Sequence, residues 1–190
     1  MTSLGSDWGV YSPLPAISGS TKMQAGTPSF NQAFTCFPMY VSALSSDNQS
    51  VSIKLDSPTG TLNTNGACAV GGYLRSTGTA NSGTLVAFQA YGSSCNILSK
   101  SGSTFTQRAT NTLSSAITAG DVFELRAVSN GYTLYRNGLV VCSWLDSGNL
   151  MTIGASNHRG GAIVMSANNA NTSYAAQYSM AVDEFTLKDI

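Results

Sequence analysis

Apolar and polar side chains alternate with the period of a β-strand most clearly in the second half of the chain. Val122–Val128 alternates in this way. Its apolar face consists of Phe123, Leu125 and Ala127. Two Asn-Gly pairs follow, at residues 130–131 and 137–138, and such pairs favour the positive φ angles of a tight hairpin turn. The pattern therefore predicts a three-stranded antiparallel meander.

The last strand of this meander, Leu139–Trp144, ends in an aromatic residue. Trp144 alternates with Cys142 and Val140, so all three are expected on the core side of the strand. Aromatic residues are favoured in strands because they pack well on a pleated surface. Core packing is therefore the simpler interpretation of Trp144, and a platform for sugar rings is the alternative.

Strand-like segments separated by turn residues recur about every ten residues through the rest of the chain, which is typical of a sandwich or barrel. The segments are Phe34–Val41, Gln49–Leu55, Ala69–Arg75, Leu85–Tyr91, Cys95–Lys100, Thr104–Arg108, Met151–Gly154, Ala162–Ser166 and Tyr178–Leu187. Helical periodicity is nearly absent. About a dozen strands are too many for a seven-stranded immunoglobulin-type domain. We expect an all-β fold, a two-sheet antiparallel sandwich, in one domain over residues 1–190.

The N-terminal segment differs from the rest in its prolines. Ser12–Ile17 contains two of them, and proline lacks the N–H that a sheet ladder needs. Residues 1–16 are therefore expected to form an extended arm that lies along a neighbouring subunit rather than in a sheet. The start of the chain lacks the pattern of a signal peptide. The longest nearly apolar stretch of the whole sequence, Gly138–Leu145, is shorter than the roughly 20 residues of a membrane helix. We expect a protein made in a bacterial cytoplasm, without a membrane partner.

Charged residues make up only 9% of the chain, and nine basic and nine acidic side chains cancel. Without a net positive field, nucleic acid is not an expected partner. A surface of Ser, Thr, Asn and Gly carries little like-charge repulsion, which favours packing against other subunits. The same composition is common in secreted β-rich domains, so this alternative stays open.

The four cysteines, Cys36, Cys68, Cys95 and Cys142, do not have the spacing of a metal site. Cysteine often behaves as a small buried apolar residue. Free, buried thiols are expected, and a late-formed disulfide is the alternative. No cofactor and no metal are predicted.

Three segments carry a resemblance to a known superfamily: Ala119–Arg126, Tyr132–Gly138 and Val182–Phe185. Their pattern, G-D-x-x-x-L-R followed by L-Y-x-N-G and a terminal D-[DE]-F, resembles the concanavalin A-like lectin/glucanase superfamily in its laminin G-like branch. Within it, the chain is similar to domains of minor tail proteins and other virion proteins of phages that infect actinobacteria, mycobacteria especially.

This resemblance implies a jelly-roll sandwich over nearly the whole chain. It further implies a non-enzymatic structural virion protein of a bacteriophage, either a minor tail or a capsid-decoration protein. Its partners would be capsid or tail subunits, and it would form a homo-oligomer in the virion. The alternative is a carbohydrate-binding module that recognises a glycan on the host cell surface.

Glucanases of this superfamily carry a Glu-x-Asp-x-Glu strand, in which the carboxylates share one face. No two acidic residues of this chain are two positions apart. Asp183 and Glu184 are neighbours and are expected on opposite faces of a strand. A pair of carboxylates on the two sides of a glycosidic bond is therefore not expected, and no catalytic residues are predicted.

The candidate contacts for a glycan or a protein partner are Trp8, Tyr11, Asn157, His158 and Arg159. The last three lie in a glycine-flanked loop, and binding residues are often found on such loops. His158 is the only histidine and is expected to be exposed, without a carboxylate partner. Asp146 and Asn149 could contribute to a calcium site, but a turn that closes the meander is the favoured interpretation.

Overall fold

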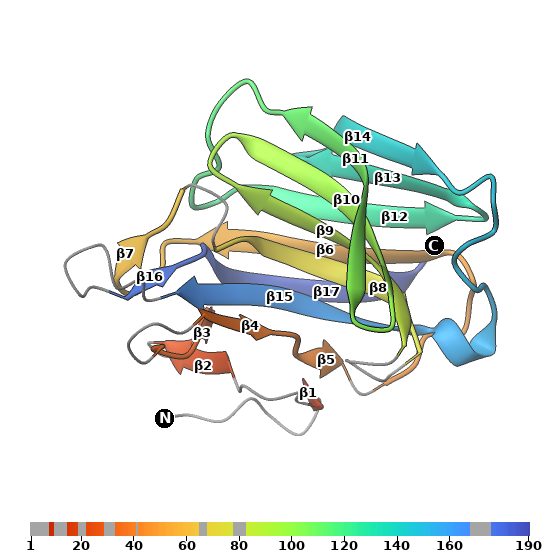
Figure 1. Ribbon diagram of the computed structural model, residues 1–190, viewed down its shortest axis with the longest axis horizontal. Helices are drawn as coiled ribbons and strands as arrows, with labels where there is room; N and C mark the ends of the chain where they lie inside the picture. The colour runs from red at the N-terminus through yellow and green to blue at the C-terminus, as the bar shows by residue number, and fades with distance from the viewer. Residues whose placement is uncertain are drawn as a thin grey trace.

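The computed structural model describes residues 8–9, 15–18, 22–28, 33–40, 42–64, 68–77, 83–167 and 176–190. In these residues two β-sheets pack face to face (Figure 1). A single turn of 3-10 helix, Ala155–Asn157, is the one helical element among them, and no described helix could cross a membrane. The two-sheet jelly-roll sandwich predicted from the sequence is confirmed.

One sheet has seven strands in the described part of the chain, in the order β14-β13-β12-β6-β17-β3-β2. Their bounds are β2 Pro15–Ser18, β3 Lys22–Ala25, β6 Gln49–Asp56, β12 Val122–Val128, β13 Gly131–Arg136, β14 Leu139–Leu145 and β17 Ala181–Asp189. All neighbouring strands in it are antiparallel. The predicted meander is the run from β12 to β14.

The second sheet has ten strands among the described residues. Its main path is β1-β5-β15-β8-β9-β10-β11, while β4 and β16 also pair with β15, and β7 runs parallel to β16. The bounds are β1 Trp8–Gly9, β4 Ala33–Cys36, β5 Met39–Tyr40, β7 Thr61–Leu62, β8 Val70–Ser76, β9 Thr84–Tyr91, β10 Ser94–Ser101, β11 Thr104–Thr112, β15 Arg159–Ala167 and β16 Gln177–Tyr178.

The main core lies between the two sheets. Phe88 of β9 and Phe123 of β12 stack across it with their ring centroids 6.0 Å apart, and both are fully buried. Gly72 of β8 is required there, because a Cβ would lie 2.9 Å from the Phe88 ring. The inward-facing residues of the two sheets together form one buried apolar layer.

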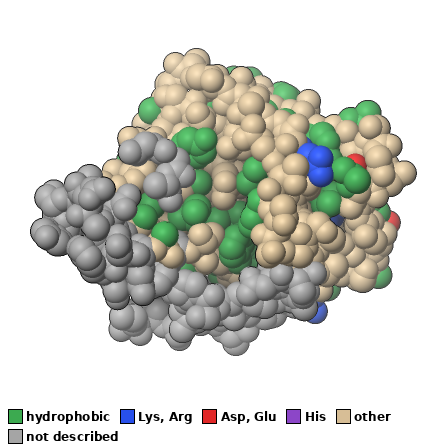
Figure 2. Space-filling view, in the orientation of Figure 1, with side chains coloured by type: hydrophobic (Ala, Val, Ile, Leu, Met, Phe, Trp, Pro, Cys, Tyr) green, Lys and Arg blue, Asp and Glu red, His purple; other side chains and the backbone are tan. Residues whose placement is uncertain are grey.

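A smaller apolar cluster covers the outer face of the ten-stranded sheet. It consists of Met39, Tyr73, Leu85, Ala87 and Ile163, with Phe37 and Met165 packed against it. Figure 2 shows this side of the molecule, where hydrophobic side chains line the floor of a hollow.

A stack of cationic and aromatic side chains closes the gap between edge strands β11 and β14. Arg108 lies over the ring of Trp144, and that ring stacks on Tyr132 at 5.0 Å. Arg75 lies on the other side of Tyr132, and its Nη1 donates to the tyrosine hydroxyl at 2.7 Å. Arg75 is only 1% exposed, so the stack carries a positive charge into the interior.

Two local predictions in and after the meander are wrong. A register shift in the β13–β14 ladder leaves Val141 without a Cα partner, so Val141 packs against the core and Val140 is 62% exposed. Trp144 does pack against the core as predicted. Residues 151–154 do not form a strand and lead into the 3-10 turn instead.

The two turns of the meander differ. Asn137 and Gly138 both have positive φ and form the predicted two-residue hairpin turn. The first turn lies one residue earlier than predicted, at Ser129 and Asn130, because Gly131 already pairs with Val128.

Parts of the expected N-terminal arm pair with strands of the same chain. Trp8 and Gly9 pair with β5, and Pro15 and Ala16 pair with β3. The expectation that proline keeps this segment out of a sheet is wrong for Pro15, since β2 is the last strand at its edge and an edge tolerates a missing N–H. The other residues of 1–16 lie outside the described residues.

We predict that Tyr132→Phe destabilises the fold. The hydroxyl accepts a hydrogen bond from a buried guanidinium, and its removal leaves that donor without its partner. The free energy of unfolding, measured by urea denaturation, should fall by about 1–3 kcal/mol. Tyr91→Phe is the matched control at a partly buried site and should change it by less than about 0.5 kcal/mol. Equal effects of the two variants would contradict the role of the stack.

Candidate functional site

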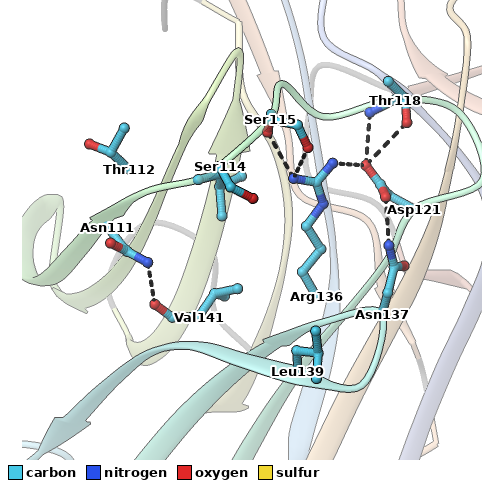
Figure 3. Close-up of a pocket in the computed structure, with 11 residues that line it drawn as sticks. Asn111, Thr112, Ser114, Ser115, Thr118, Asp121, Arg136, Asn137, Leu139 and Val141 are labelled. Atoms are coloured by element: carbon cyan, nitrogen blue, oxygen red, sulfur yellow. Dashed lines mark hydrogen bonds and ion pairs between the residues drawn. The ribbon is translucent and has the colours of Figure 1, made fainter.

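A pocket of about 610 Å³ opens where β11, the edge of the ten-stranded sheet, lies beside β14, the edge of the seven-stranded sheet (Figure 3). Its volume lies in the range of small-molecule sites. Hydroxyl and amide side chains make up most of the wall. The lining residues are Asn111, Thr112, Leu113, Ser114, Ser115, Thr118, Asp121, Arg136, Asn137, Leu139 and Val141.

The loop between β11 and β12 forms one wall of this pocket. Leu113 and Ile117 are buried and hold the loop to the ten-stranded sheet. Their N–H groups donate to the carbonyls of Ser93 and Gly92, at 2.8 and 2.7 Å. The exposed serines between these two anchors therefore have a fixed backbone.

Arg136, the last residue of β13, holds this loop through hydrogen bonds to its backbone. Its Nη1 donates to the Ser115 carbonyl at 2.8 Å, and its Nη2 donates to the Ala116 carbonyl at 2.9 Å. Nη2 also forms an ion pair with Asp121 at 2.6 Å. The side chains of this ion pair are only 12% and 7% exposed, so the guanidinium positions the wall rather than reaching into solvent.

Asp121 is the turn residue before β12, as predicted, and it also joins the two walls. It accepts from the Thr118 N–H and from the Asn137 side-chain amide, both at 2.8 Å. Burial alone would raise the pKa of Asp121, but the Arg136 guanidinium, the Thr118 N–H and the Asn137 amide outweigh it and hold that pKa below its usual range. The carboxylate is therefore ionised, and both of its oxygen atoms accept hydrogen bonds from the protein.

The floor of the pocket bridges the two sheets. Asn111 of β11 donates from Nδ2 to the carbonyl of Val141 in β14, at 2.7 Å (Figure 3). Leu139 at the rim is 73% exposed. The pocket thus combines neutral hydrogen-bonding groups with an apolar rim, while its two charges are paired with each other. This arrangement suits a neutral, hydroxyl-rich ligand.

Asn157, His158 and Arg159 are the predicted contact residues whose side chains the structure describes, and none of them lines this pocket. Trp8 is in β1, where its backbone pairs with Tyr40 and its side chain is outside what the structure describes. Tyr11 lies outside the described residues. Arg159 is the first residue of β15 and is half-buried.

The prediction that Asn157 and His158 are exposed is wrong. Asn157 is 1% exposed, and its amide donates to the Arg75 carbonyl and to the Thr84 hydroxyl. His158 is 7% exposed, with Nε2 2.8 Å from an Asp47 carboxylate oxygen and Nδ1 3.1 Å from the Leu44 carbonyl. These hydrogen bonds hold the loop before β15 in place within the protein.

The expected separation of Asp183 and Glu184 is also wrong. A register shift between Val182 and Glu184 in the β6–β17 ladder brings both carboxylates to Lys54, at 3.3 and 2.5 Å from its Nζ. The ammonium lies between them, and its two partners raise the pKa of Lys54. Asp183, Glu184 and Lys54 therefore form a salt-bridge cluster at the surface.

Asp146 closes the meander as the favoured interpretation predicted. Its carboxylate accepts from the N–H groups of Leu150 and Met151, at 3.1 and 2.8 Å. Within the described ranges, no three His, Cys, Asp or Glu side chains gather as they would around a metal ion.

Sequence reasoning missed the pocket because most of its residues are ordinary turn and loop residues. Asp121 and Asn137 were recognised only as turn residues. The segment Asn111–Ser115, polar except for Leu113, has no periodicity that distinguishes it from any loop. A combination of a polar run after one edge strand and an Asn-Gly turn before the other is the one signal that could have indicated it.

Comparisons with known proteins support the fold assignment. Residues 23–189 match the model of the family described as Domain of unknown function (DUF7257). No curated protein matches the sequence.

Solved structures with lectin-like folds are similar to this chain. The carbohydrate binding module CBM66 from Bacillus subtilis has a TM-score of 0.58 at 14% identity, with 96% of each chain covered. A protein of unknown function with a galectin-like fold from Bacillus subtilis has a TM-score of 0.60 at 12% identity, covering 96% of this chain and 89% of that one. The β-glucanase of Bacillus licheniformis has a TM-score of 0.60 at 9% identity, covering 98% and 94%. At these identities the similarity shows the concanavalin A-like fold alone.

We predict that Asp121→Asn destabilises the fold in a pH-dependent way. At pH 7 the variant leaves Arg136 buried without its carboxylate, so the free energy of unfolding should fall by about 3 kcal/mol. Because the folded-state pKa of Asp121 is depressed, its contribution is present above the unfolded value of about 3.9 and is lost as pH falls through the folded value. Urea denaturation from pH 7 to pH 2 should therefore show the two proteins converging in acid.

Asp56→Asn is the control, since Asp56 pairs with Lys22 at the surface. It should change the free energy of unfolding by less than about 1 kcal/mol. A difference between wild type and Asp121→Asn that stays constant with pH would contradict the assignment.

Proposed function

We propose that this chain, which belongs to the DUF7257 family, is a non-catalytic carbohydrate-binding domain, and that the pocket between β11 and β14 holds a neutral sugar. The observation that carries the proposal is the composition of this pocket. Hydroxyl and amide groups line it, and the two charges in the lining engage each other.

The hydrogen-bonding groups at the rim match a polyol. Thr112 and Ser114 are exposed hydroxyls that can both donate and accept, as the hydroxyls of a sugar do. Leu139 offers an apolar contact beside them for the C–H groups of a sugar ring. Asp121 and Arg136 are paired with each other, so neither offers an unpaired charge to an ionic ligand, and a neutral ligand is favoured.

The described polar clusters argue against catalysis. Both ring nitrogens of His158 face oxygen atoms of the protein, so neither is positioned to take a proton from a substrate. Asp183 and Glu184 are held by one ammonium instead of lying on the two sides of an open cleft. The fold is shared with a carbohydrate binding module and with a β-glucanase, so it supports sugar recognition, while only the side chains argue against catalysis.

An array of neutral and anionic oligosaccharides tests this proposal. We expect neutral glycans to bind and to be recovered unchanged. Thr112→Trp should fill the mouth of the pocket and weaken binding by at least about tenfold, which equals about 1.4 kcal/mol. Thr106→Trp, at an exposed site on the same strand away from the pocket, should leave the affinity within about twofold. Absence of glycan binding, or equal losses in both variants, would contradict the proposal.

The second candidate function is a structural virion protein of a bacteriophage, working through contacts with capsid or tail subunits. The specific observation in its favour is the exposed apolar side chains on edge strand β14, where Leu139, Val140 and Leu145 are 73%, 62% and 69% exposed. Exposed apolar residues on an edge strand favour contact with another subunit.

Mass spectrometry of purified particles tests this second candidate. We expect the chain in washed virions at a defined copy number, with hundreds of copies indicating head decoration and a handful indicating the tail tip. Replacement of Leu145 by Glu should reduce incorporation, while Thr186→Glu on the polar face of β17 should not. Absence of the chain from particles would exclude this role.

A further inference from the structure

Two of the four cysteines come from strands of the two different sheets and belong to the same buried core cluster. Cys95 lies in β10 of the ten-stranded sheet and Cys142 in β14 of the seven-stranded sheet. The two strands pack against each other, and the two side chains influence each other's acidity. Both thiols are free, and they are 0% and 9% exposed.

The surrounding hydrogen bonds hold these two strands in place. Asn111 is the partner of Cys95 in the β10–β11 ladder, and its side chain donates to the carbonyl of Val141, the residue before Cys142. The link that forms the pocket floor thus also fixes the strands that carry the two thiols (Figure 3).

The two thiols differ in acidity. The neighbouring Cys142 side chain lowers the pKa of Cys95, and the Asn111 N–H and the charge of Arg136 add to this against the effect of burial. The Cys95 side chain and burial raise the pKa of Cys142. Burial raises the pKa of the other two cysteines, Cys36 and Cys68, to about 11. Since the thiolate is the reactive form, the lower pKa favours Cys95 over Cys142 as the attacking thiol once local opening exposes the pair.

We propose that Cys95 and Cys142 form a redox-active pair that closes into a disulfide between the two sheets when a small-molecule disulfide is present. The inference does not rest on the proposed function, because it concerns bond formation within the chain.

The disulfide would form by thiol–disulfide exchange, through a mixed disulfide with the external reagent. When β14 opens locally, the Cys95 thiolate attacks one sulfur of the external disulfide, whose S–S bond breaks and releases one external thiolate. Cys142 then loses its proton and attacks the sulfur of Cys95, which releases the second external thiolate. The two external thiolates take up the two protons, so the protein is oxidised by two electrons and the reagent is reduced to two thiols.

The test uses the folded full chain with Cys36→Ala and Cys68→Ala, which keeps only the proposed pair. Oxidised glutathione should lower its mass by about 2 Da, and a peptide map should show the Cys95–Cys142 link. The chain with Cys95→Ala and Cys142→Ala is the matched control and should form no internal disulfide. The wild-type chain should give the same link, which guards against a folding defect in the variant.

Oxidation should also raise the midpoint of thermal unfolding. The disulfide closes a loop of roughly 50 residues, and for a chain of this size the midpoint should rise by about 10 °C. A stable single glutathione adduct, a link that involves Cys36 or Cys68, no reaction in the folded state, or a lowered midpoint would each overturn the proposal.

Discussion

The contact between the inner faces of the two sheets is the constraint on which the rest of this molecule depends. Phe88 and Phe123 meet there, one from each sheet, and their rings stack within the shared core. The guanidinium of Arg136 lies over the ring of Phe123, 6.0 Å from its centroid. The side chain that supports the pocket wall therefore rests directly on the core.

The edge strands β11 and β14 lie beside each other but belong to different sheets, so no backbone ladder joins them. Side chains connect the strands there: Trp144 and Tyr132 stack between two arginines, and Asn111 reaches the backbone of Val141. Side-chain links leave more room than backbone pairing does. The pocket lies at this edge because the sandwich is closed there by side chains.

Alternation and turn residues were sufficient to predict a two-sheet antiparallel sandwich, and the resemblance to a known superfamily added the jelly-roll assignment. The pattern failed where the strand period is interrupted. An extra residue in β14 exposes Val140, and the register shift in β17 brings Asp183 and Glu184 to one lysine. A shift of one position reverses the face of every later side chain, and no local pattern signals it. The burial of His158 depends on Asp47, which lies 111 positions away, so only the folded chain shows it. The pocket depends on the same kind of distant pairing.

The placement of the few charged residues explains why the site is neutral. Lys54 holds two carboxylates on the outer face of the seven-stranded sheet, and Glu124 pairs with Arg126 on the same sheet. The ion pair of Arg136 and Asp121 holds the wall of the pocket in place. With 9% charged residues and no net charge, the chain has little long-range field to attract an ionic ligand. Recognition then depends on short-range hydrogen bonds and shape, and rigid hydroxyl and amide groups on a braced loop provide both.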